Sequence, residues 1–482
     1  MGLNPGVYFD SDLNQFTLQG KSSSYVFRIT NSGLLEHLHW GEGVHGDVVD
    51  DLSYLSADSN VISFDAGEKN SKMLEFSDYG TGDFRTPSFH VRLNNGTWIT
   101  PVKYKNHQII PGKPTIEITD PTNPQSFLPL LYATTEEATS LIVTLEDLLT
   151  GIEVNLHYTI FHQFDILTRR TVINSKHESV SIESLQSATV DFPQSNACGG
   201  DSSFHFTHLS GAWARERHLE TRPLGLGTAS ISSKRGVSSH QHNPFAVISR
   251  GPYHEDQGEH FAFNLVYSGN FMIEAEVVQT GRLRVNTGIN PFNFRWELNS
   301  NGSFLSPEVV LAYSNHGMGE ISRQLHKLYQ TNLIRGYWRD LPRPILVNSW
   351  EAMYFAVTHE KIINNLAIPA SELGIELVVL DDGWFGKRNS DRTSLGDWYV
   401  NELKFPQGLG PLATEVNDLG LMFGIWMEPE MISVDSDLYR AHPDWALHVG
   451  DRPRTEGRNQ LVLGIKIKII SFFIHFFTMN NS

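Results

Sequence analysis

Tryptophan and carboxylate residues recur together in three short motifs near the end of the chain. The motifs are Asn348-Ser349-Trp350-Glu351, Asp381-Asp382-Gly383-Trp384 and Ile425-Trp426-Met427-Glu428-Pro429-Glu430. Carboxylates accept charge-assisted hydrogen bonds from neutral hydroxyls, and a flat indole offers an apolar face to the C–H side of a pyranose ring. A sugar uses both features, so the pattern favours a sugar-binding site. The alternative is three unrelated core tryptophans with solvent-facing acids, with Asp382-Gly383 as a plain turn.

Each motif follows a short apolar run that predicts a β-strand. These runs are Ile345 to Asn348, Ile375 to Leu380 and Leu421 to Trp426. Polar residues at the carboxyl ends of parallel strands lie at the open mouth of a barrel or sheet, where the sites of α/β proteins are built. The three motifs are therefore expected at one edge of one sheet.

Helices are predicted between these strands. Thr358 can cap a helix that ends before Gly374, and Pro411 can start a second helix that Gly420 closes. The order strand, helix, strand, helix, strand predicts a parallel sheet.

Residues 1 to about 330 show a different pattern, the alternation typical of half-buried antiparallel strands. It is clearest from Ile152 to Ile160, which follows the apolar run Leu141 to Leu145 across a predicted hairpin loop. Similar runs at Tyr25 to Thr30, Phe271 to Val278 and Arg282 to Val285 favour a large β-sandwich. A helical stripe then predicts a connecting helix, formed by Ile321, Leu325, Leu328 and Tyr329.

Charge and composition exclude several classes of protein. The 482 residues carry 54 acidic and 37 basic side chains, a net charge of −17 that would repel phosphate backbones and anionic lipids. We therefore expect neither a nucleic acid nor a membrane as partner. The single cysteine, Cys198, forms no intrachain disulfide, and the first residues show no secretory signal, which favours the cytoplasm. Sequons at Asn95 and Asn301 leave secretion open.

Other motifs have simpler readings. The segment Gly41 to Gly46 fits G-x-G-x-x-G but runs into acidic residues, so it predicts a loop and not a dinucleotide site. The pairs His205/His208 and His240/His242 have spacings that a metal could use, but structural histidines are favoured. The last residues, 464–482, have no acidic side chain and differ from the rest, which suggests read-through or a shifted frame more than a short membrane span.

Several longer motifs occur in order along the chain. Those in the second half are Asn348 to Ala352, Leu380 to Gly386, Gly424 to Met431 and Gly457 to Gln460. Those in the first half are Tyr79 to Arg85, Trp213 to Arg217 and Ser232 to Gln241. With these motifs the chain resembles the α-galactosidases of glycoside hydrolase family 36. The resemblance covers Met1 to Leu463.

This resemblance implies an N-terminal β-sandwich, a (β/α)8 barrel, a small C-terminal β-domain and retaining hydrolysis of terminal α-galactosides such as raffinose or melibiose. It implies no metal and no organic cofactor. By analogy, Asp381 and Asp382 bind the outer hydroxyls of galactose, Trp426 lines the sugar pocket, Trp350 forms part of its wall and Arg458 contacts the ligand. Glu428 is expected to orient these groups from behind.

The sequence departs from the family pattern at the catalytic residues. Retaining glycosidases need two carboxyl groups about 5 Å apart, and in this family the nucleophile lies in a Lys-Trp-Asp segment that does not occur here. We therefore assign no catalytic residue and expect this chain to be inactive. A non-catalytic galactoside-binding protein and a galactosyltransferase-type relative remain alternatives.

The expected organisation is multidomain, a large N-terminal antiparallel β-sandwich followed by the first part of a (β/α)8 barrel. The expected segments are the sandwich with its connecting helix (1–330), a partial barrel (331–463) and an unrelated apolar tail (464–482). Because three or four parallel strands cannot close a barrel, poor solubility is expected. The family resemblance also implies a possible homotetramer, with a loop near Asp47 to Tyr54 entering a neighbour's pocket.

Overall fold

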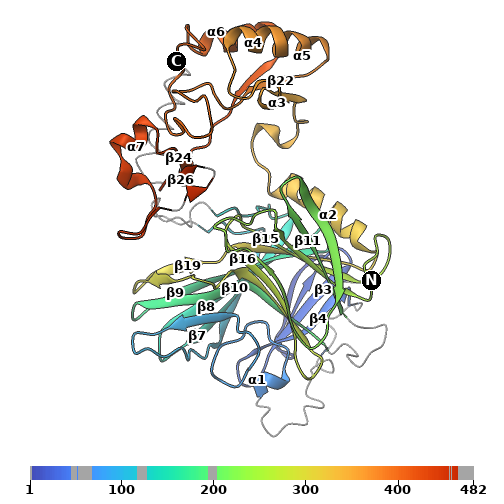
Figure 1. The fold of residues 1–482 in the computed structure, drawn as a ribbon. Helices are drawn as coiled ribbons and strands as arrows, with labels where there is room; N and C mark the ends of the chain where they lie inside the picture. Colours follow the sequence, from blue (N-terminus) through green and yellow to red (C-terminus); the bar gives the residue numbers. More distant parts are fainter. Residues whose placement is uncertain are drawn as a thin grey trace. The chain divides into compact units, whose positions relative to one another are not determined.

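The computed structural model describes residues 3–44, 52, 68–116, 128–193, 204–454, 456–457 and 459–464. The chain divides into two compact units, Met1–Arg339 and Asp340–Ser482 (Figure 1). This division lies nine residues beyond the boundary at 330 expected from the sequence.

The first unit is built almost entirely of β-strands. Its strands are β1 (Gly6–Asp10), β2 (Gln15–Gln19), β3 (Ser23–Ile29), β4 (Leu35–Glu42), β5 (Phe89–Arg92), β6 (Lys103–Pro111), β7 (Ala138–Asp147), β8 (Ile152–Phe161), β9 (Ile166–Ser175), β10 (Val180–Phe192), β11 (Phe204–Ala212), β12 (Arg215–Pro223), β13 (Gly227–Ser232), β14 (His242–Arg250), β15 (His260–Val266), β16 (Phe271–Val277), β17 (Leu283–Ile289), β18 (Trp296–Leu298), β19 (Ser303–Leu305) and β20 (Glu308–Ser314). Its helices are α1 (Glu68–Ser71), α2 (Met318–Asn332) and the short 3-10 turn η3 (Tyr337–Arg339).

These strands form antiparallel sheets. Within the described ranges, the largest sheet has the order β12-β11-β14-β15-β20-β9-β8-β7-β6, with β19 beside β9. A second has the order β13-β16-β17-β10-β18, with β5 beside β10, and a third runs β1-β2-β3-β4. One apolar core draws side chains from all three sheets, among them Phe16, Tyr158 and Val285. The predicted β-sandwich is confirmed.

The alternating segments form strands as the sequence indicates. Strands β7 and β8 pair along their whole lengths, from Ala138 opposite Phe161 to Asp147 opposite Ile152. The hairpin turns at Gly151, whose φ of 71° places it in the left-handed region. A Cβ at this position would lie 2.0 Å from the His177 ring, so the close packing also requires glycine.

Charged residues inside the sandwich form paired networks. Asp191 accepts hydrogen bonds from Arg284 at 2.7 Å and from Arg85 at 2.9 Å, and all three side chains are buried. Burial raises the pKa of Asp191, but the two guanidinium groups outweigh it and lower that pKa to about 2. The alternation pattern gives no sign of such pairs.

The predicted connecting helix is α2. Its buried residues Ile321, Leu325 and Leu328 pack in one cluster with Val310 and Phe161 of the largest sheet. The helix therefore belongs to the core of the first unit.

The predicted loop at Gly41 to Gly46 is partly wrong. Strand β4 extends through Gly41 and Glu42, because their backbones pair with Ser24 and Ser23 of β3. The glycines thus end a strand, and the segment begins its loop only at Gly43. His45 and Gly46 lie outside the described residues.

The second unit holds a parallel sheet with the order β21-β22-β23, as predicted. Its strands are β21 (Leu346–Asn348), β22 (Leu377–Leu380) and β23 (Met422–Ile425). Its helices are α3 (Trp350–Met353), α4 (His359–Ile362), the π-helical segment η4 (Ile363–Ala367), α5 (Ile368–Glu372), α6 (Gly410–Asp418), α7 (Asp437–Ala441) and the 3-10 turn η5 (Pro443–Trp445). A small antiparallel sheet follows, β24 (Met431–Ile432), β26 (Gln460–Val462) and β25 (Glu456–Gly457).

The helix predicted from Thr358 to Gly374 is present over residues 359–372, but its middle five residues are π-helical and not α-helical. The Thr358 hydroxyl accepts a hydrogen bond from the Lys361 backbone N–H and caps α4. Pro369 has no N–H to donate and its ring would clash with the carbonyl four residues earlier, and the chain widens into η4 just before it. The sequence interpretation overlooked this proline.

Several predictions lie outside the described residues. These are Arg458, Cys198, the residues 465–482 and, except for Leu52, the segment Asp47 to Tyr54.

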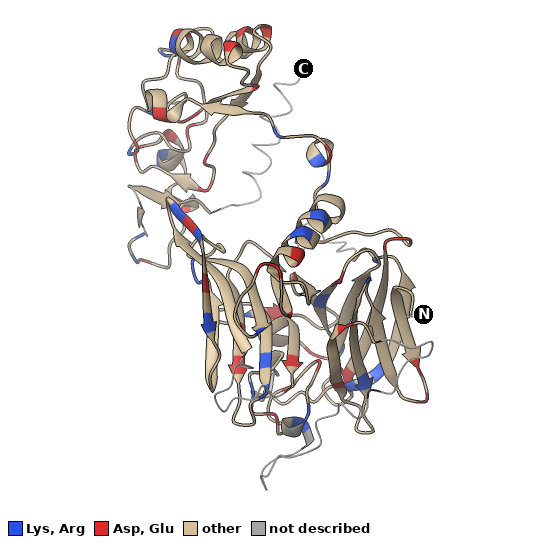
Figure 2. Cartoon of the chain, turned by 90° about the vertical axis from the view of Figure 1, so that its right-hand side faces the viewer, with Lys and Arg blue, Asp and Glu red and all other residues tan. Residues whose placement is uncertain are grey.

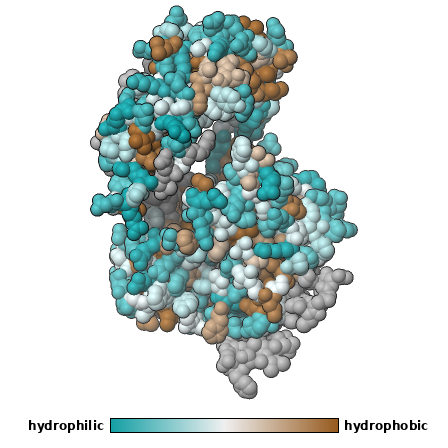
Figure 3. Space-filling model, viewed as in Figure 1, coloured by the Kyte–Doolittle hydropathy of each residue, from teal (hydrophilic) through white to brown (hydrophobic). Residues whose placement is uncertain are grey.

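The helices in the described ranges are all too short or too polar to span a lipid bilayer. Figure 2 shows acidic and basic residues on both units, and Figure 3 shows a face on which hydrophobic residues are scattered among hydrophilic ones.

Candidate sugar-binding site

The parallel register of the second unit brings the three motifs to one edge of the sheet. Asn348 lies opposite Val379, and Leu380 lies opposite Ile425. The residues that follow these pairs leave the sheet on the same side, because parallel strands end at the same edge. The prediction that the three motifs lie at one edge of one sheet is confirmed.

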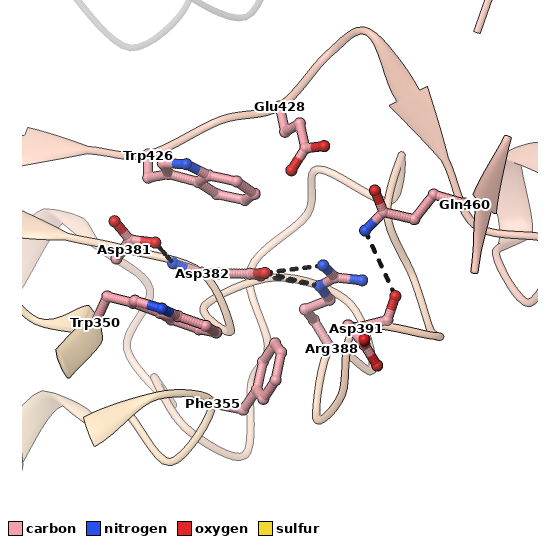
Figure 4. Close-up of a pocket in the computed structure, with 9 residues that line it drawn as sticks. All are labelled: Trp350, Phe355, Asp381, Asp382, Arg388, Asp391, Trp426, Glu428 and Gln460. Carbon is pink, nitrogen blue, oxygen red and sulfur yellow. Dashed lines mark hydrogen bonds and ion pairs between the residues drawn. The ribbon is translucent and has the colours of Figure 1, made fainter. Parts of the chain in front are cut away.

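A cavity of about 450 Å³ lies at this edge (Figure 4). It is lined by Trp350, Phe355, Asp381, Asp382, Arg388, Asp391, Trp426, Glu428 and Gln460. Of the site residues named from the sequence, Trp350, Asp381, Asp382 and Trp426 therefore share one cavity. Glu428, which was expected behind these residues, instead lines the cavity with them. The fifth, Arg458, lies outside the described residues.

Asp381 is held by the neighbouring strand and by its own backbone. The Asn348 side-chain amide donates to Oδ2 at 2.6 Å, and the Asp382 backbone N–H donates to Oδ1 at 2.7 Å. The Asp381 backbone N–H donates to the hydroxyl of the buried Ser349 at 3.0 Å. Each carboxylate oxygen thus keeps acceptor capacity for a ligand hydroxyl.

Asp382 forms a buried ion pair with Arg388. The guanidinium Nε donates to Oδ1 at 2.9 Å and to Oδ2 at 3.1 Å, and Nη2 donates to Oδ2 at 2.8 Å (Figure 4). The sequence interpretation missed Arg388. The sequence could have indicated it, because a buried carboxylate requires a cation nearby and Arg388 is the arginine six positions after Asp382.

The tryptophans of the three motifs divide into two kinds. Figure 4 shows Trp350 and Trp426 on either side of Asp381 and Asp382. Trp384, in contrast, is fully buried and donates its indole N–H to the Trp426 carbonyl at 3.0 Å. The core-tryptophan alternative therefore holds for Trp384 only.

The acidic residues divide in the same way. Glu428 lines the cavity, whereas Glu351 is exposed and accepts a hydrogen bond from the Tyr354 hydroxyl at 3.2 Å. Asp391, which the motifs did not indicate, also lines the cavity, and its carbonyl accepts from the Gln460 amide at 3.5 Å.

Lys404 connects the loops behind the cavity. Its ammonium donates to the carbonyls of Phe355 and Gly383 at 2.7 Å each and to that of Arg388 at 3.1 Å. Burial lowers the pKa of Lys404, and the nearby Asp382 carboxylate opposes this. The sequence interpretation missed this residue, since it lies 21 positions from Gly383, the motif residue whose carbonyl it holds.

No group of three or more His, Cys, Asp or Glu side chains in the described part of the chain is placed to share a metal ion. His208 and His242 lie with ring centroids 5.6 Å apart in the first unit, on neighbouring strands β11 and β14.

A sandwich unit followed by parallel strands that present carboxylates and indoles at one edge fits the class of carbohydrate-binding proteins. The family models agree. The model described as "Glycosyl hydrolase family 36 N-terminal domain" matches residues 33–299, and the melibiase model matches residues 303–479. The chain therefore belongs to glycoside hydrolase family 36. The melibiase match extends to residue 479 and so passes Leu463, the last residue that the family resemblance of the motifs covers.

The similar proteins are α-galactosidases. AgaA of Geobacillus stearothermophilus is 45% identical over 467 residues, which cover 95% of this chain and 61% of the relative. The crystal structure of the Lactobacillus brevis α-galactosidase matches with a TM-score of 0.90 and 36% identity, over 98% of this chain and 62% of that one. A variant of AgaA solved in complex with raffinose matches with a TM-score of 0.86 and 45% identity, over 93% and 61%. The chain thus spans about three fifths of the length of these relatives.

Proposed function

We propose that the cavity at the edge of the parallel sheet binds the terminal α-D-galactosyl residue of oligosaccharides such as melibiose and raffinose. The observation that carries this proposal is the placement of Asp381 and Asp382 between Trp350 and Trp426 in one cavity. The relatives named α-galactosidases, one of them in complex with raffinose, support the same ligand.

The chemistry of the lining fits a neutral polyol. The carboxylate oxygens of Asp381 and Asp382 accept hydrogen bonds, so the ligand must supply donors, and sugar hydroxyls do so. The indoles of Trp350 and Trp426 can pack against the apolar C–H faces of the ring. A volume of about 450 Å³ lies in the range of small-molecule sites.

For the reaction, we propose retaining hydrolysis by the family's double-displacement route in a protein that carries both required carboxyl groups. The 482 residues contain no Lys-Trp-Asp segment. Asp381 and Asp382 are adjacent in sequence, and Asp382 is committed to Arg388. We therefore propose that this chain binds galactosides without cleaving them.

Calorimetry beside a turnover assay tests both parts. Titration with melibiose should give measurable heat, and p-nitrophenyl α-galactoside should release no nitrophenol above the buffer rate. Glu428→Gln should weaken binding, whereas the matched variant Glu351→Gln, on an exposed side chain outside the cavity, should not. Absence of binding would refute the site, and turnover that survives in the purified chain but is lost in Asp381→Asn would refute the non-catalytic proposal.

A further inference from the structure

Among the described residues, one side chain holds the Asp382 carboxylate in place through hydrogen bonds. All the hydrogen bonds that the structure gives this carboxylate come from Arg388. Asp381 differs, because its two oxygens are held by the Asn348 amide and by a backbone N–H. The direction of the Asp382 side chain therefore depends on a single guanidinium group.

That guanidinium group is itself fixed on several sides. Its Cζ lies 5.5 Å from the centroid of the Phe355 ring and 5.9 Å from that of the Phe385 ring, within the range of cation–π contacts. Its Nη1 donates to the Thr393 carbonyl at 2.9 Å, and Lys404 holds the Arg388 backbone carbonyl at 3.1 Å. Arg388 is 1% exposed, so this arrangement does not depend on solvent.

The pair also determines which part of Asp382 remains available. Nε and Nη2 occupy Oδ1 once and Oδ2 twice, which leaves acceptor capacity mainly on Oδ1. A free carboxylate would rotate about its terminal torsion, whose energy profile is broad. Arg388 thus holds the Asp382 carboxylate in one orientation, in which Oδ1 keeps acceptor capacity for a ligand.

We propose that Arg388 is a positioning residue for galactoside binding, which acts by fixing the carboxylate of Asp382. This inference rests on the proposed function, because it concerns the same cavity. On this proposal, part of the affinity for the galactoside depends on the buried Arg388 side chain. Arg388 orients the Asp382 carboxylate so that it can accept a hydrogen bond from a ligand hydroxyl group. An ion pair with a purely structural role would affect folding and leave the affinity of the folded protein unchanged.

The experiment compares four variants with the whole chain by calorimetry, using methyl α-D-galactopyranoside as the probe. The variants are Arg388→Gln, Arg388→Lys, Asp382→Asn and the double variant Arg388→Gln/Asp382→Asn. The matched control is Arg392→Gln, an exposed arginine four positions along the same loop. Urea unfolding of each variant separates loss of fold from loss of affinity. The double variant protects the test, because it leaves no unpaired buried charge.

We expect Arg388→Gln to weaken binding about 10- to 100-fold, as for a lost charged hydrogen bond, with Arg392→Gln unchanged. Arg388→Lys should recover part of the affinity, since it keeps the charge and loses the two-pronged geometry. The double variant should bind within about twofold of Asp382→Asn alone, because residues that act through one another are not additive.

Two results would overturn the inference while leaving the proposed function intact. One is a folded Arg388→Gln that binds the galactoside as tightly as the parent chain. The other is a double variant whose loss equals the product of the two single losses. If the parent chain itself shows no binding, the proposed function fails and the inference fails with it.

Discussion

Gly383 allows the second motif to pass against the backbone of the loop after α3, and Gly383→Ala tests how closely that packing is set. The residue has a φ of 101°, a conformation that side chains disfavour. A Cβ there would lie 3.0 Å from the Phe355 Cα and 3.2 Å from its carbonyl oxygen. Lys404 holds both loops by donating to the carbonyls of Phe355 and Gly383, so neither can move freely.

The expected loss has two parts. The positive φ costs an alanine about 1–2 kcal/mol. Forcing a methyl group against backbone that resists movement costs about another 1–3 kcal/mol, as in overpacked cores. Gly420 provides a matched control, because its φ is 81° and no described atom lies within 4 Å of an added Cβ. Gly420→Ala should therefore show the first part alone.

The assay is urea unfolding of the full chain, followed by calorimetry with melibiose. Gly383→Ala should lose about 1–3 kcal/mol more than Gly420→Ala, which is the contact cost. It should also weaken binding, because displacement of Phe355 moves a ring that lines the cavity and contacts Arg388. Equal destabilisation by the two substitutions, with unchanged affinity, would refute the reasoning.

Three further outcomes are expected. Burial, with help from Arg170 and Lys113, lowers the pKa of His157 to about 3, so below about pH 6.5 the unfolded chain gains a proton that the folded chain does not. His157 therefore does not lower the free energy of unfolding above about pH 6.5, and it lowers that energy progressively as the pH falls below this value. Urea unfolding at pH 5 should give a free energy of unfolding about 2 kcal/mol smaller than above pH 6.5. His157→Gln should remove this decrease. Thr358→Ala removes the cap of α4 and should cost about 1 kcal/mol of unfolding free energy, against no change in the exposed Ser11→Ala. Trp426→Ala should weaken melibiose binding by at least about tenfold in calorimetry, because it removes an aromatic wall of the cavity, and an unchanged affinity would contradict that placement.

The sequence is sufficient to predict the strands and their polar ends because those patterns are local. The alternation from Ile152 to Ile160 and the apolar run before Asp381 depend on neighbours one to four positions away. The order of strands in the large sheet depends on pairings between distant segments, such as β9 with β20, which no local pattern records. The same limit applies to the buried pair of Asp191 and Arg284, which are 93 positions apart.

The missed residues of the site have the same physical origin. Arg388 is only six positions from Asp382, but its direction depends on how the loop folds back, with the Lys387 N–H donating to the Ser394 hydroxyl at 2.9 Å. Lys404 reaches three carbonyls in two loops, so its role follows from tertiary packing alone. Pro369 was readable from the sequence, because a proline within a predicted helix removes one backbone hydrogen bond and distorts the helix, here into the π-helical segment that precedes it.

The recurrence of similar motifs at three strand ends has a structural reason beyond ligand contact. Asn348 at the end of β21 donates to Asp381 after β22, and Trp384 donates to the Trp426 carbonyl after β23. Each motif therefore supplies a group that faces the cavity and a group that holds its neighbour. Since adjacent parallel strands fix the register of these contacts, a change in one motif displaces the next. The site is consequently a property of the paired strands together, and its carboxylates and indoles keep their relative positions only while both pairings remain intact.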